Sequence, residues 1–183
     1  MSTFDGMKWR AAFLATLCLA AFFVQACGNQ SAGNSPTAPQ STRPTVALST
    51  PAGAVSLGET FASSVEVHHL GETFYAAFDV TYDPRVLEFQ GASDGTFLSN
   101  RGVDATLFQA ALQDGRPGQV AVGMSRVARV RGVSGGGTLL SLSFKAIHAG
   151  TTTLAFADPR AIRSSDHRDV PVEAWEDRVI TVQ

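Results

Sequence analysis

The chain has 183 residues, with 14 Lys and Arg against 16 Asp and Glu and a formal net charge of −2 at pH 7. This balance lacks the positive surplus needed to neutralise nucleic-acid phosphates, so the composition argues against a nucleic-acid-binding role. Hydrophobic residues make up 44% of the chain, and its length suits one domain with a sizeable core.

The first element in the chain is a short apolar run. Residues 11–24, AAFLATLCLAAFFV, follow the positive residues Lys8 and Arg10. A helix of this length spans about 21 Å, less than the roughly 30 Å of a bilayer core, so the run is too short to cross a membrane. A positive start, a short apolar run and a small residue near the end are typical of a secretory signal. We therefore expect residues 1–26 to be a cleaved signal peptide.

The run ends in Val24-Gln25-Ala26-Cys27, which resembles the bacterial lipobox. The resemblance implies that Cys27 receives lipid and becomes the mature N-terminus; the alternative is an ordinary signal peptide with an incidental cysteine. Gly28 follows, where Asp indicates inner-membrane retention, so an outer-membrane or cell-surface destination is favoured. The other cysteine, Cys18, leaves with the signal, so no disulfide is expected.

A polar linker separates this anchor from the rest of the chain. Residues 28–44, GNQSAGNSPTAPQSTRP, have too little apolar content to form a core. As a flexible coil they span roughly 20–25 Å, enough to lift a domain off a membrane. We therefore expect a lipidated cysteine and linker over 27–44 and one folded domain over 45–183.

Within that domain the hydrophobic pattern has period two. In 74–82, the residues Phe74, Ala76, Phe78, Val80 and Tyr82 share one face. The same alternation occurs in 119–124 and 140–146. Further strands are predicted at 45–49, 61–69, 86–91, 105–112, 151–157 and 178–182, separated by Gly- and Pro-containing turns. Many short strands without a helical stripe predict an all-β, antiparallel sandwich or jelly roll.

Two segments of this domain carry a family resemblance. FYAAFDVTYDPRVLEF (74–89) runs from an alternating strand into a turn that Asp83 can cap and Pro84 preorganises, and GTLLSLSFKA (137–146) follows later. Both resemble segments of cohesin domains, with looser matches at 45–48 and 176–182. The resemblance implies a nine-stranded jelly roll that docks another protein; the best-known cohesins bind calcium-loaded dockerin modules in polysaccharide-degrading complexes.

The resemblance also implies a binding surface on one sheet face. It would comprise the outward residues of neighbouring strands, which are Tyr75, Ala77, Asp79, Gln119, Ala121 and Ser125. Family members often present Asn or Asp where this chain has Tyr75 and Ala77. The chain therefore departs from the family's polar pattern at two positions of the predicted surface.

No catalytic constellation is evident, so we predict a non-enzyme with no cofactor and no metal site. His68 and His69 are adjacent in a predicted strand and so face opposite ways. Ser134–Gly137 lacks the Lys-Ser/Thr ending of a phosphate loop. Arg126, Arg129 and Arg131 indicate an exposed basic loop. A calcium ion bound in a loop stays possible, with nothing in the sequence to support it.

These patterns favour an exported, membrane-tethered module that docks a secreted protein of the dockerin type. Two alternatives stay open: a carbohydrate-binding module that retains polysaccharide or cell-wall glycan, and a scaffold subunit of an envelope or secretion assembly. With only Trp175, Tyr75 and Tyr82 beyond the signal, a long strip of sugar-stacking aromatic rings is not expected.

Overall fold

The computed structural model describes residues 42–127 and 129–183, and within them all regular structure is β-strand. The predicted signal peptide, Cys27 and most of the predicted linker lie outside the described residues. The described part contains no helix long and apolar enough to cross a membrane.

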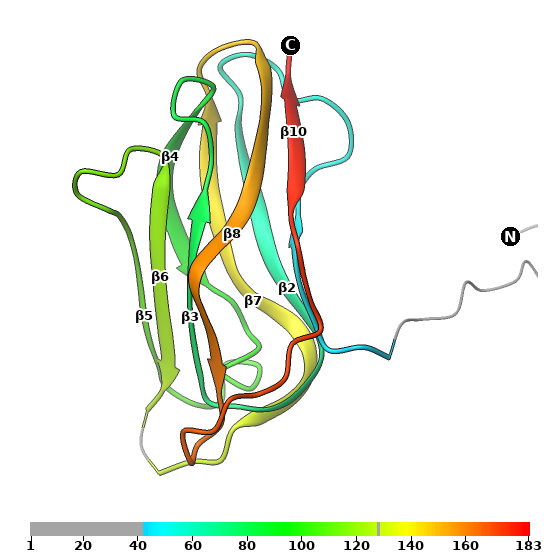
Figure 1. The fold of residues 1–183 in the computed structure, drawn as a ribbon, viewed down its shortest axis with the longest axis vertical. Helices are drawn as coiled ribbons and strands as arrows, with labels where there is room; N and C mark the ends of the chain where they lie inside the picture. Colours follow the sequence, from blue (N-terminus) through cyan, green and yellow to red (C-terminus); the bar gives the residue numbers. More distant parts are fainter. Residues whose placement is uncertain (1–41, 128) are drawn as a thin grey trace, which may run out of the picture. The chain divides into compact units, whose positions relative to one another are not determined.

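In the described part of the chain, ten strand segments form two five-stranded sheets that pack face to face (Figure 1). The first sheet has the order β4 (Leu87–Asp94), β7 (Val133–Ala146), β2 (Thr60–Thr73), β1 (Thr45–Ser49) and β9 (Ala174–Glu176). The second has the order β10 (Arg178–Val182), β8 (Gly150–Arg163), β3 (Tyr75–Thr81), β6 (Gln119–Arg126) and β5 (Thr106–Leu112). The predicted antiparallel β-sandwich is confirmed.

The period-two pattern explains which side of each strand is buried. On β3, Ala76, Phe78 and Val80 are fully buried, and Val120, Val122 and Met124 of β6 point into the same core. Inward residues of β2 and β7 meet them from the opposite sheet. Because successive side chains of a strand alternate between faces, the remaining residues of β3 and β6 form the outer face of the second sheet.

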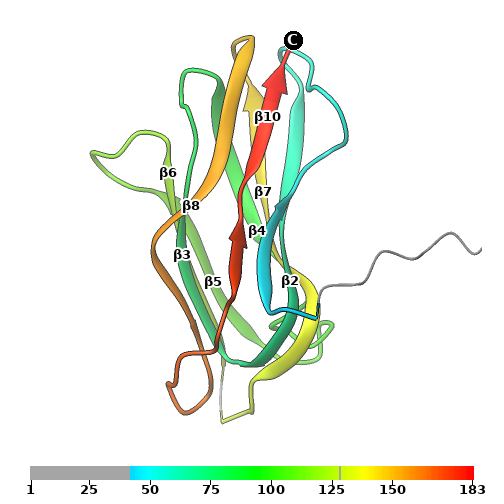
Figure 2. The same ribbon diagram turned by 45° about the vertical axis from the view of Figure 1, so that its right-hand side comes forward.

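The C-terminal strand changes sheets partway along its length. β9 pairs in parallel with β1, whereas β10, which follows after Asp177 alone, pairs antiparallel with β8. Asp177 Oδ1 accepts a hydrogen bond of 2.9 Å from the Phe156 amide of β8. Figure 2 shows the two red segments running one after the other along the side of the sandwich. Counted as one interrupted strand, they agree with the expected nine.

Several strands extend beyond their predicted ends because they contain bulges. β8 was predicted to stop at 157 but continues through Pro159 to Arg163. Its register on β3 passes from Asp79↔Ala157 to Ala77↔Ala161, so three residues of β8 stand opposite one residue of β3. A strand proline is tolerated at such a bulge because one ladder hydrogen bond is already lost there.

Candidate functional site

The outer face of the second sheet collects the residues predicted to bind a partner. The pairing of β3 with β6 places Tyr75 opposite Ser125, Asp79 opposite Ala121, and Thr81 opposite Gln119. Ala77 lies between Tyr75 and Asp79 on the same face, so all six predicted residues share one surface. Whether they contact a partner stays a prediction.

Asp79 is not a free carboxylate on this face. Asp79 is only 3% exposed. Its Oδ2 accepts hydrogen bonds from Gln113 Nε2 at 3.0 Å and from Gln119 Nε2 at 2.5 Å. The two amide side chains cover the carboxylate and are themselves oriented by it. Asp79 and Gln119 therefore shape this end of the face together.

The face is wider than the sequence predicted, because β5 and β8 flank the β3–β6 pair. Read from β5 through β6 and β3 to β8, its rows are Leu107, Ser125, Tyr75, Arg163; Gln109, Gly123, Ala77, Ala161; and Ala111, Ala121, Asp79, Ala157. Most of these side chains are small. Tyr75 and Leu107 are the large nonpolar groups of the first row.

Two hollows lie on either side of Tyr75. The one toward β5, of about 570 Å³, has Leu107, Gly123 and Ala121 in its lining and includes no charged residue. The one toward β8, of about 470 Å³, includes Arg163 and His167. Arg163 Nε lies 3.4 Å from Asp169 Oδ1. The two sides of Tyr75 thus differ in charge.

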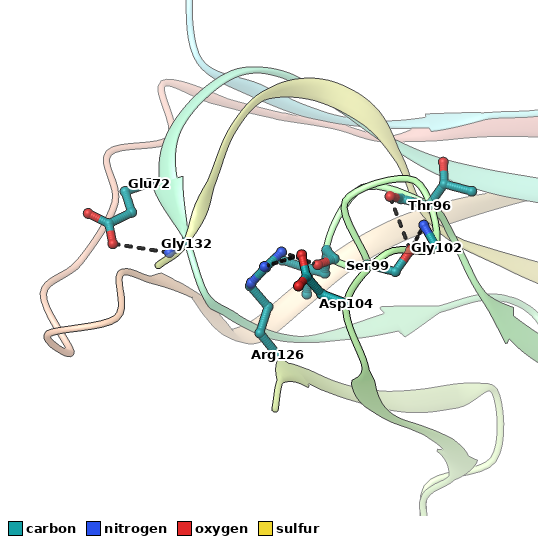
Figure 3. Close-up of polar contacts among 8 residues, drawn as sticks. Glu72, Thr96, Ser99, Gly102, Asp104, Arg126 and Gly132 are labelled. Atoms are coloured by element: carbon teal, nitrogen blue, oxygen red, sulfur yellow. Dashed lines mark hydrogen bonds and ion pairs between the residues drawn. The ribbon is translucent and has the colours of Figure 1, made fainter. Parts of the chain in front are cut away.

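Arg126 is buried, so its prediction as part of an exposed basic loop was wrong. Its side chain is 4% exposed, donates from Nη2 to Asp104 Oδ2 at 2.7 Å, and donates from Nη1 to the Leu98 carbonyl (Figure 3). Its Nε has no hydrogen-bond partner. Arg126 stands two residues after the buried Met124 in the same strand, and residues two apart share a face. This spacing could have predicted from the sequence that Arg126 points inward.

The segment between β4 and β5 is held by Arg126 and by its own hydrogen bonds. Ser99 Oγ donates to the Thr96 carbonyl at 3.2 Å and accepts from the Gly102 amide at 3.1 Å (Figure 3). The Val127 amide donates to the Ala105 carbonyl at 3.0 Å, just before β5 begins. This segment therefore sets where β5, and with it Leu107, enters the face.

Glu72 ties together two loops at the end of β2. Its Oε1 accepts a hydrogen bond from Ser165 Oγ at 2.6 Å. The same oxygen accepts a hydrogen bond from the Gly132 amide at 3.1 Å (Figure 3). The hydrogen bond from Ser165, followed by that from Gly132, holds the pKa of Glu72 below its usual value. The neighbouring loop also carries Asp166, whose pKa is lowered chiefly by its hydrogen bond from Ser164.

Other residues considered in the sequence lie away from this face or are occupied. His68 and His69 are both exposed, and His69 has a φ of 53° within a bulge of β2. Trp175 packs its ring edge-on against Phe78 and Phe156, with centroids 5.8 and 5.0 Å away. Among residues 42–127 and 129–183, no group of three or more His, Cys, Asp or Glu side chains is placed to hold a metal ion.

The fold and the face define a class: a two-sheet β-sandwich module with a broad, shallow surface of small side chains on one sheet. A family model described as the cohesin domain matches residues 44–182. The chain therefore belongs to the cohesin domain family, and the resemblance in its sequence is confirmed. Comparison with curated proteins finds no match.

Solved cohesin structures share this fold. The non-cellulosomal cohesin from the archaeon Archaeoglobus fulgidus is 19% identical, with a TM-score of 0.60 over 77% of this chain and 91% of its own. The sixth cohesin of Acetivibrio cellulolyticus scaffoldin B, solved with a Cel5 dockerin mutant, is 16% identical, with a TM-score of 0.60 over 77% and 99%. The cohesin chain of a type II cohesin–X-dockerin complex from the same organism is 13% identical, with a TM-score of 0.64. The match covers 77% of this chain and 100% of that one.

Proposed function

We propose that this chain is a non-catalytic docking module that binds a dockerin-bearing secreted protein through the outer face of β8, β3, β6 and β5. The single observation that carries the proposal is the cohesin-family match over residues 44–182. Two of the related structures were solved with dockerins, which supports a partner of the same type. The small side chains that make up most of this face are compatible with a protein surface approaching closely.

We further propose that the module is exported and lipid-anchored at the cell envelope. The support is the signal-like run at 11–24, Cys27 after Ala26, and the polar residues 28–44. Several acyl chains on one cysteine would anchor the protein stably, because each buried methylene contributes about 0.8 kcal/mol. Mass spectrometry of the N-terminal peptide from envelope fractions tests this, and an unmodified Cys27 would contradict it.

The docking proposal is tested with the soluble chain 28–183 and dockerin modules encoded in the same genome. We expect at least one calcium-loaded dockerin to bind in titration calorimetry with a dissociation constant of about 1 µM or tighter. Calcium removal by a chelator is expected to abolish binding, because dockerins are calcium-loaded when they dock. Retardation on polysaccharide gels, or stoichiometric co-purification with envelope proteins, in the absence of any dockerin binding would contradict the proposal.

A further inference from the structure

Gly123 lies in the middle of β6, at a position where the structure itself does not require glycine. Its backbone is not in the positive-φ region, and a Cβ added to it would have no atom within 4 Å. A glycine inside a strand weakens the strand, since it adds backbone entropy and removes a packing group. Such glycines often mark a place where a ligand or another backbone approaches closely.

The surroundings of Gly123 form a recess with two large walls. Gly123 is flanked across the sheet by Ala77 on β3 and Gln109 on β5. In the adjacent row, Tyr75 and Leu107 stand on either side of Ser125, and Leu107 is 67% exposed. The missing side chain at 123 therefore deepens the hollow between these walls.

The lining of this hollow also restricts what can enter it. It is formed by Tyr75, Leu107, Phe108, Gln109, Ala111, Ala121, Val122, Gly123, Met124 and Ser125. None of these side chains is charged. A charged group entering the hollow would lose part of its hydration without gaining an opposite charge, which is unfavourable. An apolar side chain would instead bury its surface favourably.

We propose that the partner places one large apolar side chain over Gly123, between Tyr75 and Leu107, and that this contact determines partner specificity. The inference rests on the proposed docking function and adds the chemistry of the anchor and its position. A few buried side chains near the centre commonly dominate the binding energy of an interface, and an aromatic or aliphatic anchor in a pocket is one such arrangement. Gly123 is the residue that keeps this pocket open.

The test uses the soluble chain 28–183 and a phage-displayed library built on calcium-loaded Cel5 dockerin of Acetivibrio cellulolyticus with randomised surface positions. Clones selected on the wild-type chain should share an apolar residue at one position. They should bind Gly123→Thr at least 10-fold more weakly. Ala62→Thr, on the outer face of β2 in the opposite sheet, should leave affinity within 2-fold.

The thermal midpoint of each variant shows whether a loss of affinity comes from a blocked hollow or from a misfolded domain. Thr is a good strand former with open space at 123, so the thermal midpoint of Gly123→Thr should equal or exceed that of the wild type. Leu107→Asp supplies a second variant: it should also lower affinity at least 10-fold. Leu112 is 51% exposed on the same strand, but its side chain does not share the face of Leu107. Leu112→Asp should therefore change affinity by less than 2-fold.

The outcomes distinguish the two proposals. Clones that bind the wild type and the Gly123→Thr and Leu107→Asp variants equally, or that share a charged residue at the common position, overturn the anchor inference and leave docking intact. A library that yields no calcium-dependent binder to the wild type overturns the proposed function, and the anchor inference with it.

Discussion

Asp83 shows how one residue organises the turn after β3. Its Oδ1 accepts from the Arg85 amide at 2.9 Å, and its Oδ2 accepts from Arg85 Nη2 at 2.8 Å. The Val86 and Leu87 amides both donate to its carbonyl at 3.0 Å. The turn that the sequence predicted from Asp83-Pro84 is confirmed, and Leu87 is thereby returned to the core.

The hydrogen bonds from the Arg85 side chain and amide hold the pKa of Asp83 below its usual value. A carboxyl group with a lower pKa in the folded state stabilises the fold above its unfolded pKa, and this stabilisation is lost as pH falls through the folded value. We therefore expect Asp83→Asn to lower the thermal midpoint more at pH 7 than at pH 2, measured by circular dichroism. Asp114→Asn, in an exposed turn, is the control, and an equal loss at both pH values would contradict the assignment.

At the scale of elements, the alternation of hydrophobic and polar residues predicted the strands that have one uninterrupted buried face. β1 and β10 have their predicted ends, and β3 lies within one residue of its prediction at each end. The prediction for β8 failed at Asp158-Pro159-Arg160, because a bulge shifts the phase of the pattern. β9 was missed because a strand of three residues, Ala174–Glu176, is too short to show an alternation of hydrophobic and polar side chains.

The same limits explain how much of the candidate site could be predicted. Tyr75, Ala77 and Ser125 were placed on one face because β3 and β6 have a clean period of two. The contributions of β5 and β8, and the two hollows, depend on which strands become neighbours. That order is set by pairing between segments far apart in the chain, which a local pattern does not contain.

Arg126 connects β6 to the segment before β5, and its removal tests that connection. Losing one partner of a buried, hydrogen-bonded ion pair leaves the other groups unsatisfied. Because Asp104 is partly exposed and can be hydrated, we expect Arg126→Met to lower the free energy of unfolding by about 2–4 kcal/mol in urea titration. Arg129→Met, at an exposed position, should change it by less than about 0.5 kcal/mol. Equal effects would contradict the structural role of Arg126.

At the scale of the whole molecule, aromatic side chains hold the two sheets together. Phe144 of β7 is fully buried, and its ring lies 5.1 Å from Tyr82, which follows β3 in the other sheet. Phe61 of β2 and Phe89 of β4 lie 6.0 and 5.8 Å from it. Neither cysteine of the chain lies within residues 42–127 or 129–183, so no disulfide links the strands described there.

Replacing Phe144 therefore removes contacts with both sheets at once. A buried Phe→Ala change costs about 3–5 kcal/mol, from lost transfer free energy and from the cavity left behind. Since a domain of this size has a total stability of about 5–15 kcal/mol, Phe144→Ala should shift the urea midpoint strongly while Phe144→Leu shifts it less. Phe108→Ala, at a half-buried position on the edge strand β5, should cost clearly less than Phe144→Ala. A larger effect at 108 than at 144 would mean that the sheets are joined elsewhere.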